Sequence, residues 1–458
     1  MKIENSFQHA SGNILLTKIV FNLIYMNILS IETSCDETAV AIIQANEKQP
    51  SKIKTLSSVV SSQVELHAEY GGVVPNLAAR EHLKNIIPVL DEALSKANLR
   101  LVDIDLFAVT QGPGLIPALL LGVNTAKTLA YFYKKPLVGV HHVAGHILSA
   151  FSDDEFNFEI DPTLFPLLTL TISGGHTQLI YTDRPFNFQI IGETQDDAAG
   201  EAFDKVAKIL DLGYPGGPII SKYADEYVKK NKIDLEKIDS QSNDTSVKKF
   251  FPRPMINKPN YNFSFSGLKT AVLYHCQKNN LTTNQVTQNL PEHAHSSEVR
   301  GRDEDFCKAY ESTSSKTEIS DKEIRRMSVS QVAFEFQESV VDVLITKTIR
   351  ALKKYPAKSI SLAGGVSANT RLRTKLKNAV KRVSNPENSG FETLSEQKIN
   401  FFMPPISLTG DNATMIAVAG FYKYLHHQQN NTPETLQKNW TNLDADANLP
   451  LTSYTVNI

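Results

Sequence analysis

Residues 28–43 read ILSIETSCDETAVAII, which is an apolar run, a polar turn at residues 32–37 and a second apolar run. The same layout returns at residues 167–181, where LLTLTI is followed by Ser173-Gly-Gly-His-Thr177 and then by QLIY. Short apolar runs on both sides of a polar turn are typical of buried strands joined as a hairpin. Two such hairpins, at the starts of two halves of the chain, predict an α/β fold built on a duplicated nucleotide-binding unit.

A third glycine-bearing turn follows another apolar run. The run SISL at residues 359–362 precedes Ala363-Gly-Gly-Val-Ser-Ala-Asn369, and a predicted helix then begins with TRLR at residues 370–373. Glycines let backbone N–H groups approach a phosphate or a ribose, and a helix N-terminus favours an anion. Most single Gly-Gly turns only reverse the chain, so it is the repetition that indicates a nucleotide site.

The sequence also contains a candidate metal site. His142 and His146 are four residues apart, so on a helix their imidazoles share one face. Asp411, just before a predicted buried helix, would complete a site of two histidines and one carboxylate. Zinc peptidases carry a glutamate general base inside such a pair, whereas Val143, Ala144 and Gly145 stand here. The pattern favours a metal that holds a substrate, and the alternative is a pair that only packs or caps a helix.

Further blocks in a fixed order extend this pattern over residues 27–425. They are Ile31-Glu-Thr-Ser-Cys-Asp-Glu-Thr38, Tyr70-Gly-Gly-Val-Val-Pro75, Ala79-Arg-Glu-His82, Gly112-Pro-Gly-Leu115, residues 127–147, Ser173-Gly-Gly-His-Thr177, Asp196-Asp-Ala-Ala-Gly-Glu-Ala-Phe-Asp-Lys205, Tyr214-Pro-Gly-Gly-Pro218, Phe263-Ser-Phe-Ser-Gly-Leu-Lys269, Gly364-Gly-Val-Ser-Ala-Asn369 and Asp411-Asn-Ala-Thr-Met415. Together they closely resemble the TsaD-type tRNA threonylcarbamoyladenosine synthases, formerly called glycoproteases.

The resemblance implies a fold and a domain organisation. The expected fold is α/β, with two lobes of the actin, sugar-kinase and Hsp70-like (ASKHA) type around a nucleotide cleft, each lobe containing a ribonuclease-H-like subdomain. We place the N-terminal lobe at residues 27–160 and the C-terminal lobe at residues 161–425, with a mobile polar insertion at about residues 281–322. Residues 426–458 are expected to form a polar, peripheral tail. A chain of 458 residues, 41% of them hydrophobic, can bury cores of this size.

Residues 1–26 form an extension before the first strand. Residues 1–25 contain Lys2 and Lys18, a single acid at Glu4 and no arginine, and their apolar run from residue 14 is too short and too interrupted to span a bilayer. This composition predicts a mitochondrial leader, with retention in the cytoplasm or a misassigned start codon as alternatives. Three cysteines without metal spacing indicate a reducing compartment.

The resemblance also implies the reaction. Family members transfer a threonylcarbamoyl group from threonylcarbamoyl-AMP to N6 of the adenosine 3′ of the anticodon, in tRNAs that read ANN codons, and release AMP. The expected partners are tRNA, a separate synthase that makes threonylcarbamoyl-AMP and a second copy of the chain, with no membrane. The net charge of −2 leaves RNA binding to local basic clusters, for which Lys134 with Lys135, Lys248–Lys249 with Arg253, and Arg371 with Arg373 are candidates.

Site residues carry over from the family by position. His142, His146 and Asp411 match its metal ligands for one divalent ion, Zn²⁺ or Fe²⁺, and Ser34 would approach the same ion. Asp36 and Glu37 would position the amine or bind the metal through water, with Asp36 the more plausible base, unless both only shape a turn. The residues expected to bind the adenylate are Thr171, Ile172, Ser173, Gly174, Gly175, Asp204, Gly217, Ser221 and Asn369.

Three other functions remain open from the residues alone. A kinase of the same fold would bind Mg²⁺ through carboxylates, a metallopeptidase would need the missing glutamate, and a scaffold subunit would need no chemistry. The two histidines and the intact glycine turns favour the transferase.

Overall fold

The computed structural model describes residues 25–240, 249–279, 281, 327–384, 399–430 and 439–454. Nearly all of the predicted leader and of the 281–322 insertion lies outside these residues. By contacts the chain divides into two compact units: one comprises Met1–Ser173, Gln178–Gly192 and Ile349–Ile458, the other Gly174–Thr177 and Glu193–Thr348. This division differs from the predicted lobes, because it groups both sheets in the first unit, and the lobe boundary at residues 160 and 161 stays a prediction.

The first sheet has the strand order β5-β4-β1-β2-β3-β6. Antiparallel strands β1 and β2 form the predicted hairpin, β3 extends it, and β4 and β5 run parallel to β1 on its other side. Its strands are β1 (Tyr25–Glu32), β2 (Glu37–Asn46), β3 (Lys52–Ser62), β4 (Leu106–Gly112), β5 (Leu137–His141) and β6 (Phe158–Glu159).

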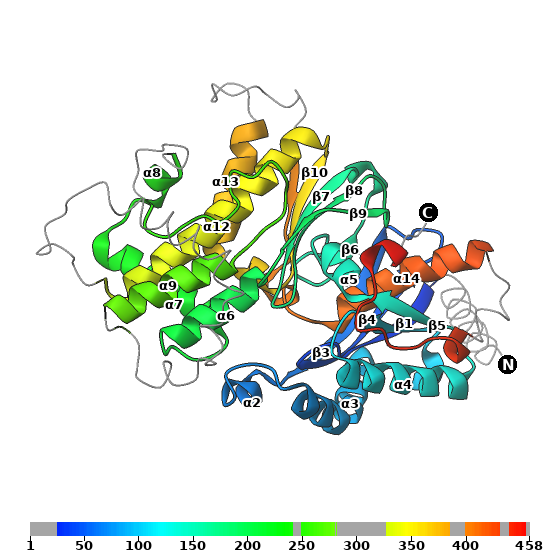
Figure 1. Ribbon diagram of the computed structural model, residues 1–458. Coiled ribbons are helices and arrows are strands. Elements are labelled where there is room, and N and C mark those ends of the chain that lie inside the picture. Colours follow the sequence, from blue (N-terminus) through cyan, green and yellow to red (C-terminus); the bar gives the residue numbers. More distant parts are fainter. Residues whose placement is uncertain are drawn as a thin grey trace, which may run out of the picture. The chain divides into compact units, whose positions relative to one another are not determined.

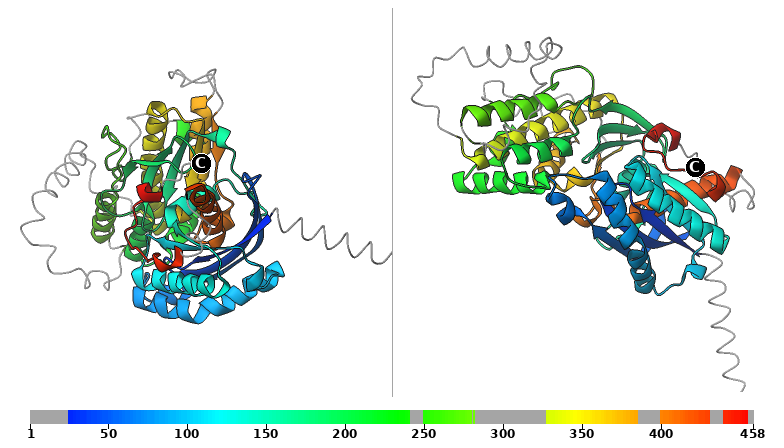
Figure 2. Two further views of the ribbon diagram at one scale, coloured as in Figure 1. Left: turned by 90° about the vertical axis from the view of Figure 1, so that its right-hand side faces the viewer. Right: turned by 60° about the horizontal axis from the view of Figure 1, so that its bottom comes forward.

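Helices cover both faces of this sheet (Figure 1). Alternate residues of a strand point to opposite faces, so Leu29 and Ile31 pack toward α3 (Pro75–Ala97) and α4 (Ile116–Tyr133). Ile28 lies in the opposite core with α5 (His142–Ser149) and α14 (Ala413–Asn430). In the left view of Figure 2 the blue strands lie between the pair α3 and α4 and the orange helix α14. The short helix α2 (Val64–Ala68) follows β3.

The second sheet repeats this topology. Its order is β11-β10-β7-β8-β9, and β10 runs parallel to both β7 and β11. Its elements are β7 (Leu167–Ile172), β8 (Thr177–Thr182), β9 (Phe188–Glu193), β10 (Ser359–Ala363) and β11 (Asn400–Phe402), and β10 leads to α13 (Thr370–Ser384). Each sheet thus has a hairpin, a third strand beyond it and two parallel strands on its other side. The predicted fold class, an ASKHA-type α/β fold with duplicated ribonuclease-H-like subdomains, is confirmed.

The second unit is mainly helical. It contains α6 (Ala199–Ile209), α7 (Gly216–Asn231), α8 (Leu235–Ser240), α9 (Ser266–Lys278) and most of α12 (Val329–Lys354). Phe203 of α6 and Phe336 of α12 pack edge to face in its core, with ring centroids 5.1 Å apart. Among the residues that the structure covers, no helix is long and apolar enough to cross a membrane.

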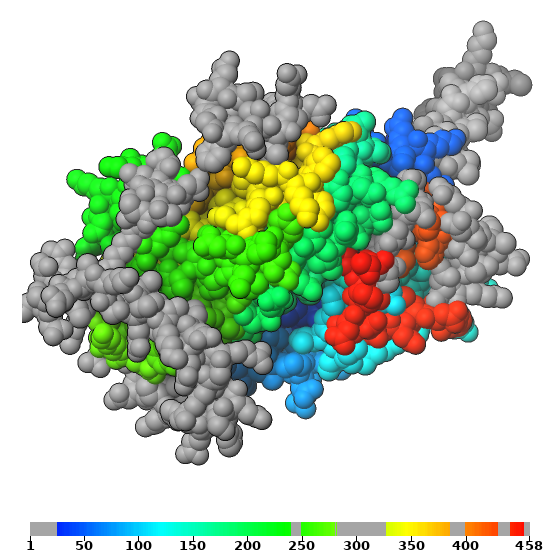
Figure 3. Space-filling model, turned by 45° about the horizontal axis from the view of Figure 1, so that its top comes forward, coloured from blue at the N-terminus to red at the C-terminus, as the bar shows by residue number. Residues whose placement is uncertain are grey.

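The end of the chain departs from the expected peripheral tail. Trp440 and Leu443 pack against the core beneath α4, and the Trp440 ring meets Tyr131 edge to face at 4.9 Å. Lys127 donates a hydrogen bond of 2.8 Å to the carbonyl oxygen of Leu443, and Leu451 is buried in the other core. Residues 439–454 therefore lie on the first sheet and its helices, as the red atoms over cyan atoms show (Figure 3). A few well-spaced apolar residues suffice for this packing.

Candidate active site

The two histidines of the candidate metal site lie on α5, which follows β5 without a loop. The side chain of His141 caps the helix, because its Nδ1 accepts a hydrogen bond of 3.1 Å from the backbone N–H of Val143. Every residue of α5 is buried. The rings of His142 and His146 are nearly perpendicular, with centroids 4.6 Å apart.

Asp411 reaches these histidines from the start of α14. Asn412 caps that helix by accepting the N–H of Met415 at 3.0 Å. Gly145 lies between the two histidines, and a Cβ added there would lie 3.0 Å from Cγ of Met415 and 3.1 Å from Cδ1 of Ile416. The small residue at position 145 thus lets α5 and α14 approach closely enough to bring Asp411 to the histidines.

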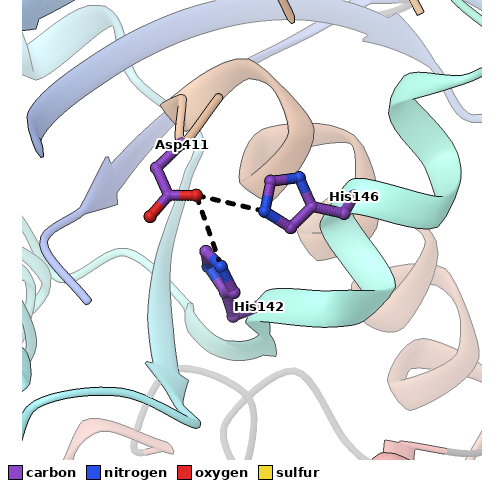
Figure 4. A group of neighbouring side chains, drawn as sticks. All are labelled: His142, His146 and Asp411. Atoms are coloured by element: carbon purple, nitrogen blue, oxygen red, sulfur yellow. Dashed lines mark hydrogen bonds and ion pairs between the residues drawn. The ribbon is translucent and has the colours of Figure 1, made fainter. Parts of the chain in front are cut away.

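The three side chains converge on one point (Figure 4). Oδ1 of Asp411 lies 3.4 Å from Nε2 of His142 and 3.1 Å from Nε2 of His146. One potential ligand atom from each residue lies within 4.8 Å of the other two. Two imidazoles and a carboxylate are a donor set that suits Zn²⁺ or Fe²⁺. The residues present therefore fit a single divalent ion, as predicted.

Glu32 is part of this site, a role that its sequence position alone does not predict. Its buried carboxylate lies 3.1 Å from Nδ1 of His142 and accepts hydrogen bonds from the backbone N–H of Ser34 and the hydroxyl of Thr110. A carboxylate on Nδ1 orients the imidazole and leaves Nε2 facing the ligand position. His146 differs, because its buried Nδ1 has no hydrogen-bond partner within the described part of the chain. The feature of the sequence that points to this role, without predicting it, is the position of Glu32 at the start of a polar turn.

Four carboxylates gather at or near the site, of which Glu32 and Asp36 are buried and Glu37 and Asp411 are half-buried. Burial disfavours the charged ring of His142, but Asp411 and Glu32 outweigh burial and raise the pKa of His142 to about 9. Burial, together with Asp411 and Asp36, raises the pKa of Glu37 well above its usual value. Without a metal, the site therefore attracts a proton to His142, and a divalent cation would replace that positive charge.

The structure brings Ser34 to the metal site and places Asp36 in the same turn. Oγ of Ser34 lies 3.2 Å from Nδ1 of His142, on the side of the ring away from Nε2. The side chain of Ser34 therefore contacts the ligand His142. Asp36 is buried within electrostatic range of Glu37, whose carboxyl is also influenced by Asp411.

Four of the residues predicted to bind the adenylate lie in the first unit, at the ends of β7 and β10. Thr171 and Ile172 are fully buried in β7, so the accessible part of the chain begins after them, at the half-buried Ser173. Gly364 adopts φ +82, and a Cβ there would lie 2.4 Å from the carbonyl oxygen of Ile172. This close approach places the turn that carries Asn369 beside the end of β7. The chain continues from β7 directly into Ser173. Oδ1 of Asn369 accepts the N–H of Leu372 at 2.9 Å and so caps α13.

The other five residues belong to the second unit. Gly174 and Gly175 are exposed, and a Cβ on either would meet no described atom within 4 Å. Asp204 accepts the N–H of Gly216 at 2.7 Å and so ties α6 to the start of α7, where Gly217 follows. Ser221, one turn along α7, donates a hydrogen bond of 2.9 Å to Oε1 of Gln337. Asp204, Gly217 and Ser221 are therefore gathered near the start of α7.

Comparison with known proteins identifies the family. The family model of TsaD, described as tRNA N6-adenosine threonylcarbamoyltransferase, matches residues 54–418. The chain belongs to the TsaD family. Proteins named tRNA N6-adenosine threonylcarbamoyltransferase from Listeria welshimeri and Bacillus anthracis are 41% and 42% identical to it, and each alignment covers 87% of this chain and 91% of the relative. A protein of that name from Kosmotoga olearia is 42% identical, with 87% of this chain and 93% of the relative covered.

Membership of the TsaD family confirms the predicted activity, formation of threonylcarbamoyladenosine in tRNA by a transferase. It favours this function over the kinase, peptidase and scaffold alternatives. The TsaD family is metal-dependent, which agrees with the convergence of His142, His146 and Asp411.

The three arginines proposed for tRNA binding by this TsaD-family chain are occupied within the protein. Arg253 forms a buried ion pair with Asp342 at 3.0 Å. Arg371 is buried, and Arg373 donates hydrogen bonds to the carbonyl oxygens of Ser367 and Pro404. Their positive charges stabilise the fold, which a sequence pattern alone does not reveal, so these three arginines are not open basic contacts. Lys248 lies outside the described residues, and Lys249 is exposed.

Proposed function

We propose that the chain transfers the threonylcarbamoyl group of threonylcarbamoyl-AMP to N6 of the adenosine 3′ of the anticodon in tRNAs that read ANN codons. We further propose that one divalent ion, Zn²⁺ or Fe²⁺, is held by His142, His146 and Asp411. The observation that carries this proposal is the convergence of these three side chains from α5 and α14, in a chain of the TsaD family.

The reaction forms a bond between N6 and the carbamoyl carbon and breaks the bond from that carbon to the phosphate oxygen of AMP. The electron pair of the broken bond leaves with AMP, and N6 loses one proton. When bound, the metal supplies Lewis-acid polarisation of the carbamoyl carbonyl and neutralises charge near the departing phosphate. An exocyclic adenine amine is a weak nucleophile, so the protein must also hold the two reactants in line.

The chain's own residues divide the remaining work. Glu32 fixes the ring of His142 through Nδ1, and Ser34 contacts the same nitrogen from the turn before β2. The raised pKa of Glu37, caused by burial and by Asp411 and Asp36, favours its protonated form. Asp36 is proposed to accept the N6 proton or to orient the amine. Because the chemistry generates AMP as a good leaving group, a strong base is not required.

The adenylate is proposed to bind through backbone groups at Ser173, Gly174 and Gly175 beyond Thr171 and Ile172, with Asn369 at the second glycine turn. Exposed glycines with free space beside Cα allow close approach of a phosphate. Asp204, Gly217 and Ser221 are proposed for the nucleoside, and their grouping at α6 and α7 supports a shared role.

The chain is also proposed to act in mitochondria as a homodimer, with a separate synthase supplying threonylcarbamoyl-AMP. The acid-poor composition of residues 1–25 supports the mitochondrial location. Cytoplasmic location is the alternative. Subcellular fractionation distinguishes the two locations, and light scattering of the purified chain gives the oligomeric state.

The test is single-turnover transfer of labelled threonine from pre-made threonylcarbamoyl-AMP to unmodified tRNA by the purified chain. His142→Ala combined with His146→Ala should abolish the bound metal and lower the rate by about 10²–10³-fold, because a preorganised electrostatic group is lost. The matched control is His426→Ala with His427→Ala, which removes two histidines at the far end of α14. Metal content is measured on every variant, which also identifies the ion.

Each outcome has a distinct meaning. Wild-type activity that the His142 and His146 change removes supports the metal-assisted transferase. Full activity in that variant would show that the histidine pair is not needed. Absence of label from the wild type leads to a repeat with bacterial-type accessory subunits, and failure there as well would overturn the proposed function.

A further inference from the structure

A buried network of polar side chains lies beside the metal site but outside it. It consists of Gln63 just before α2, His67 on α2 and His82 on α3, and all three are buried. Two sequence blocks that the proposed reaction leaves unexplained contribute to this network: Tyr70-Gly-Gly-Val-Val-Pro75 contains Val74, and Ala79-Arg-Glu-His82 contains His82. Buried polar groups are costly unless each is satisfied, so their arrangement calls for a physical explanation.

The inner end of the network fixes the protonation of His82. Nε2 of His82 lies 3.0 Å from the carbonyl oxygen of Cys35. Because a carbonyl oxygen can only accept, Nε2 must carry the proton and donate it. Burial is the main cause that lowers the pKa of His82, which favours the neutral ring, so Nδ1 is an acceptor. It receives the hydroxyl of Thr38 at 2.8 Å and lies 3.3 Å from Nε2 of Gln63.

The outer end fixes His67 in the same way. The backbone N–H of Val74 donates to Nδ1 of His67 at 3.3 Å, so in the neutral ring the proton is on Nε2. Nε2 then donates to Oε1 of Gln63 at 3.2 Å. The amide of Gln63 therefore presents its oxygen to His67 and its nitrogen to His82. Donors and acceptors alternate from Val74 to Cys35 in a chain of four hydrogen bonds that runs in one direction, and Gln63 shares the acceptor Nδ1 of His82 with the closer hydroxyl of Thr38.

This relay ends at the turn that carries Ser34 and Asp36. Three successive carbonyl oxygens of the turn are each held from a different element. That of Ser34 accepts the N–H of Leu115 at 2.8 Å, that of Cys35 accepts His82, and that of Asp36 accepts the N–H of Gln63 at 2.9 Å. Gln63 and His82 thus fix two adjacent peptide groups, and the orientation of those groups determines where the side chains of the turn point.

We propose that His82, Gln63 and His67 are positioning residues for the transfer reaction, acting through the turn of Ser34 and Asp36. The inference rests on the proposed function, in which that turn contacts His142 and orients the amine. The loop at the outer end is shaped for its contact: Gly71 adopts φ +67, a conformation that favours glycine, and the backbone then returns to place Val74 on His67. The relay thereby holds the loop of residues 69–74 and the turn of residues 33–36 in one fixed geometry.

The first test compares two replacements of His82 that keep different contacts. His82→Gln retains an amide nitrogen near the position of Nε2 and can still donate to Cys35, whereas His82→Asn is too short to reach that carbonyl. We expect His82→Asn to lower kcat about ten- to a hundredfold, with KM for tRNA and metal content unchanged, and His82→Gln to recover most of the loss. Ile86→Val, one turn further along α3 and also buried, is the control for a loss of packing.

Equal kcat values for His82→Asn and Ile86→Val at matched thermal stability would overturn the proposal, as would an equal loss in His82→Asn and His82→Gln. Wild-type activity is measured in the same assay, so an inactive wild type points to the proposed function and not to the relay.

The second test needs no activity. Nitrogen-15 NMR of the imidazoles in the full chain should show His67 and His82 as neutral rings with the proton on Nε2. Gln63→Leu removes the middle of the relay, and should change the signals of both histidines together. A proton on Nδ1 of either ring, or an imidazolium at neutral pH, would contradict the relay whatever the enzyme does.

Discussion

The two hairpins of the duplicated fold have the same arrangement of strands, but the turn of one is buried and the turn of the other is exposed. The turn between β1 and β2 is buried, polar and tied down, with three successive carbonyl oxygens held by Leu115, His82 and Gln63. The turn between β7 and β8 carries Gly174 and Gly175, which are exposed and have open space where a Cβ would be, as far as the described residues extend. The two hairpins thus share one scaffold, and their turns differ in burial and in hydrogen bonding.

The difference corresponds to two tasks that a transferase must perform. Side chains that act on a reacting amine need a fixed backbone beneath them, because small misplacements reduce rate strongly. A phosphate, in contrast, is bound well by exposed backbone N–H groups that no side chain obstructs. The first turn fits the role proposed for Ser34 and Asp36, and the second fits the role proposed for Gly174 and Gly175. Substitutions of glycine in the two regions can separate these roles.

The largest effect is expected where a methyl group would enter the rigid turn. A Cβ on Gly114 would lie 2.6 Å from the carbonyl oxygen of Ser34 and 2.8 Å from its Cβ. Gly114→Ala must therefore displace the turn, at a cost of about 1–3 kcal/mol in the free energy of unfolding. We expect kcat to fall about a hundredfold. Calorimetry and single-turnover kinetics check the two effects, and wild-type turnover in this variant would show that the turn is not rigid.

A smaller and different effect is expected at the open turn. The φ of Gly174 lies outside the left-handed region, and an added Cβ meets no described atom within 4 Å. Gly174→Ala should leave the free energy of unfolding within about 0.5 kcal/mol of the wild type. If a phosphate approaches this backbone, KM for threonylcarbamoyl-AMP should rise about tenfold, since about 1.4 kcal/mol of binding is then lost.

Titration of the donor at fixed tRNA measures that KM. The KM for tRNA serves as the internal control and should not change. An unaltered KM for the donor would mean that this turn does not contact the adenylate.

Much of the fold could be predicted from the sequence because apolar runs and turns are local signals. The hairpins at β1–β2 and β7–β8 and the strand before α13 occur where the patterns indicate them. The pair His142 and His146 was also visible, because helical spacing alone places both rings on one face. Local periodicity fixes these features without any knowledge of distant residues.

Other features depend on contacts between residues far apart in the chain. Glu32 reads as one more acid of a polar turn, and only its burial against Thr110 and His142 shows that it supports the metal site. Trp440 and Leu443 stand in a polar segment, and their packing depends on the surface of the first sheet and α4. Arg253 looks like an RNA contact until its partner Asp342 is placed beside it. Charge and polarity in a sequence do not reveal burial.

The smallest effect is expected in the pH dependence of the melting temperature, which tests the electrostatic interaction of Glu32 with His142. In the metal-free chain His142 has its pKa raised to about 9, so it stabilises the fold fully below its unfolded pKa near 6.5 and loses that contribution as pH rises through 9. Lys423, whose burial lowers its pKa to about 8, titrates in the same pH range. Its effect on the stability of the fold has the opposite sign, because the unfolded chain keeps that proton to higher pH.

Glu32→Gln removes one of the two carboxylates that raise the pKa of His142 and leaves Lys423 unchanged. The melting temperature of the chelator-treated variant should therefore fall less between pH 6.5 and 9 than that of the wild type, by a few degrees. The metal-loaded wild type should lack the fall in melting temperature that His142 causes between pH 6.5 and 9, since the metal displaces the proton from that ring. Identical slopes in the two metal-free proteins would mean that Glu32 orients the ring without contributing to its charge.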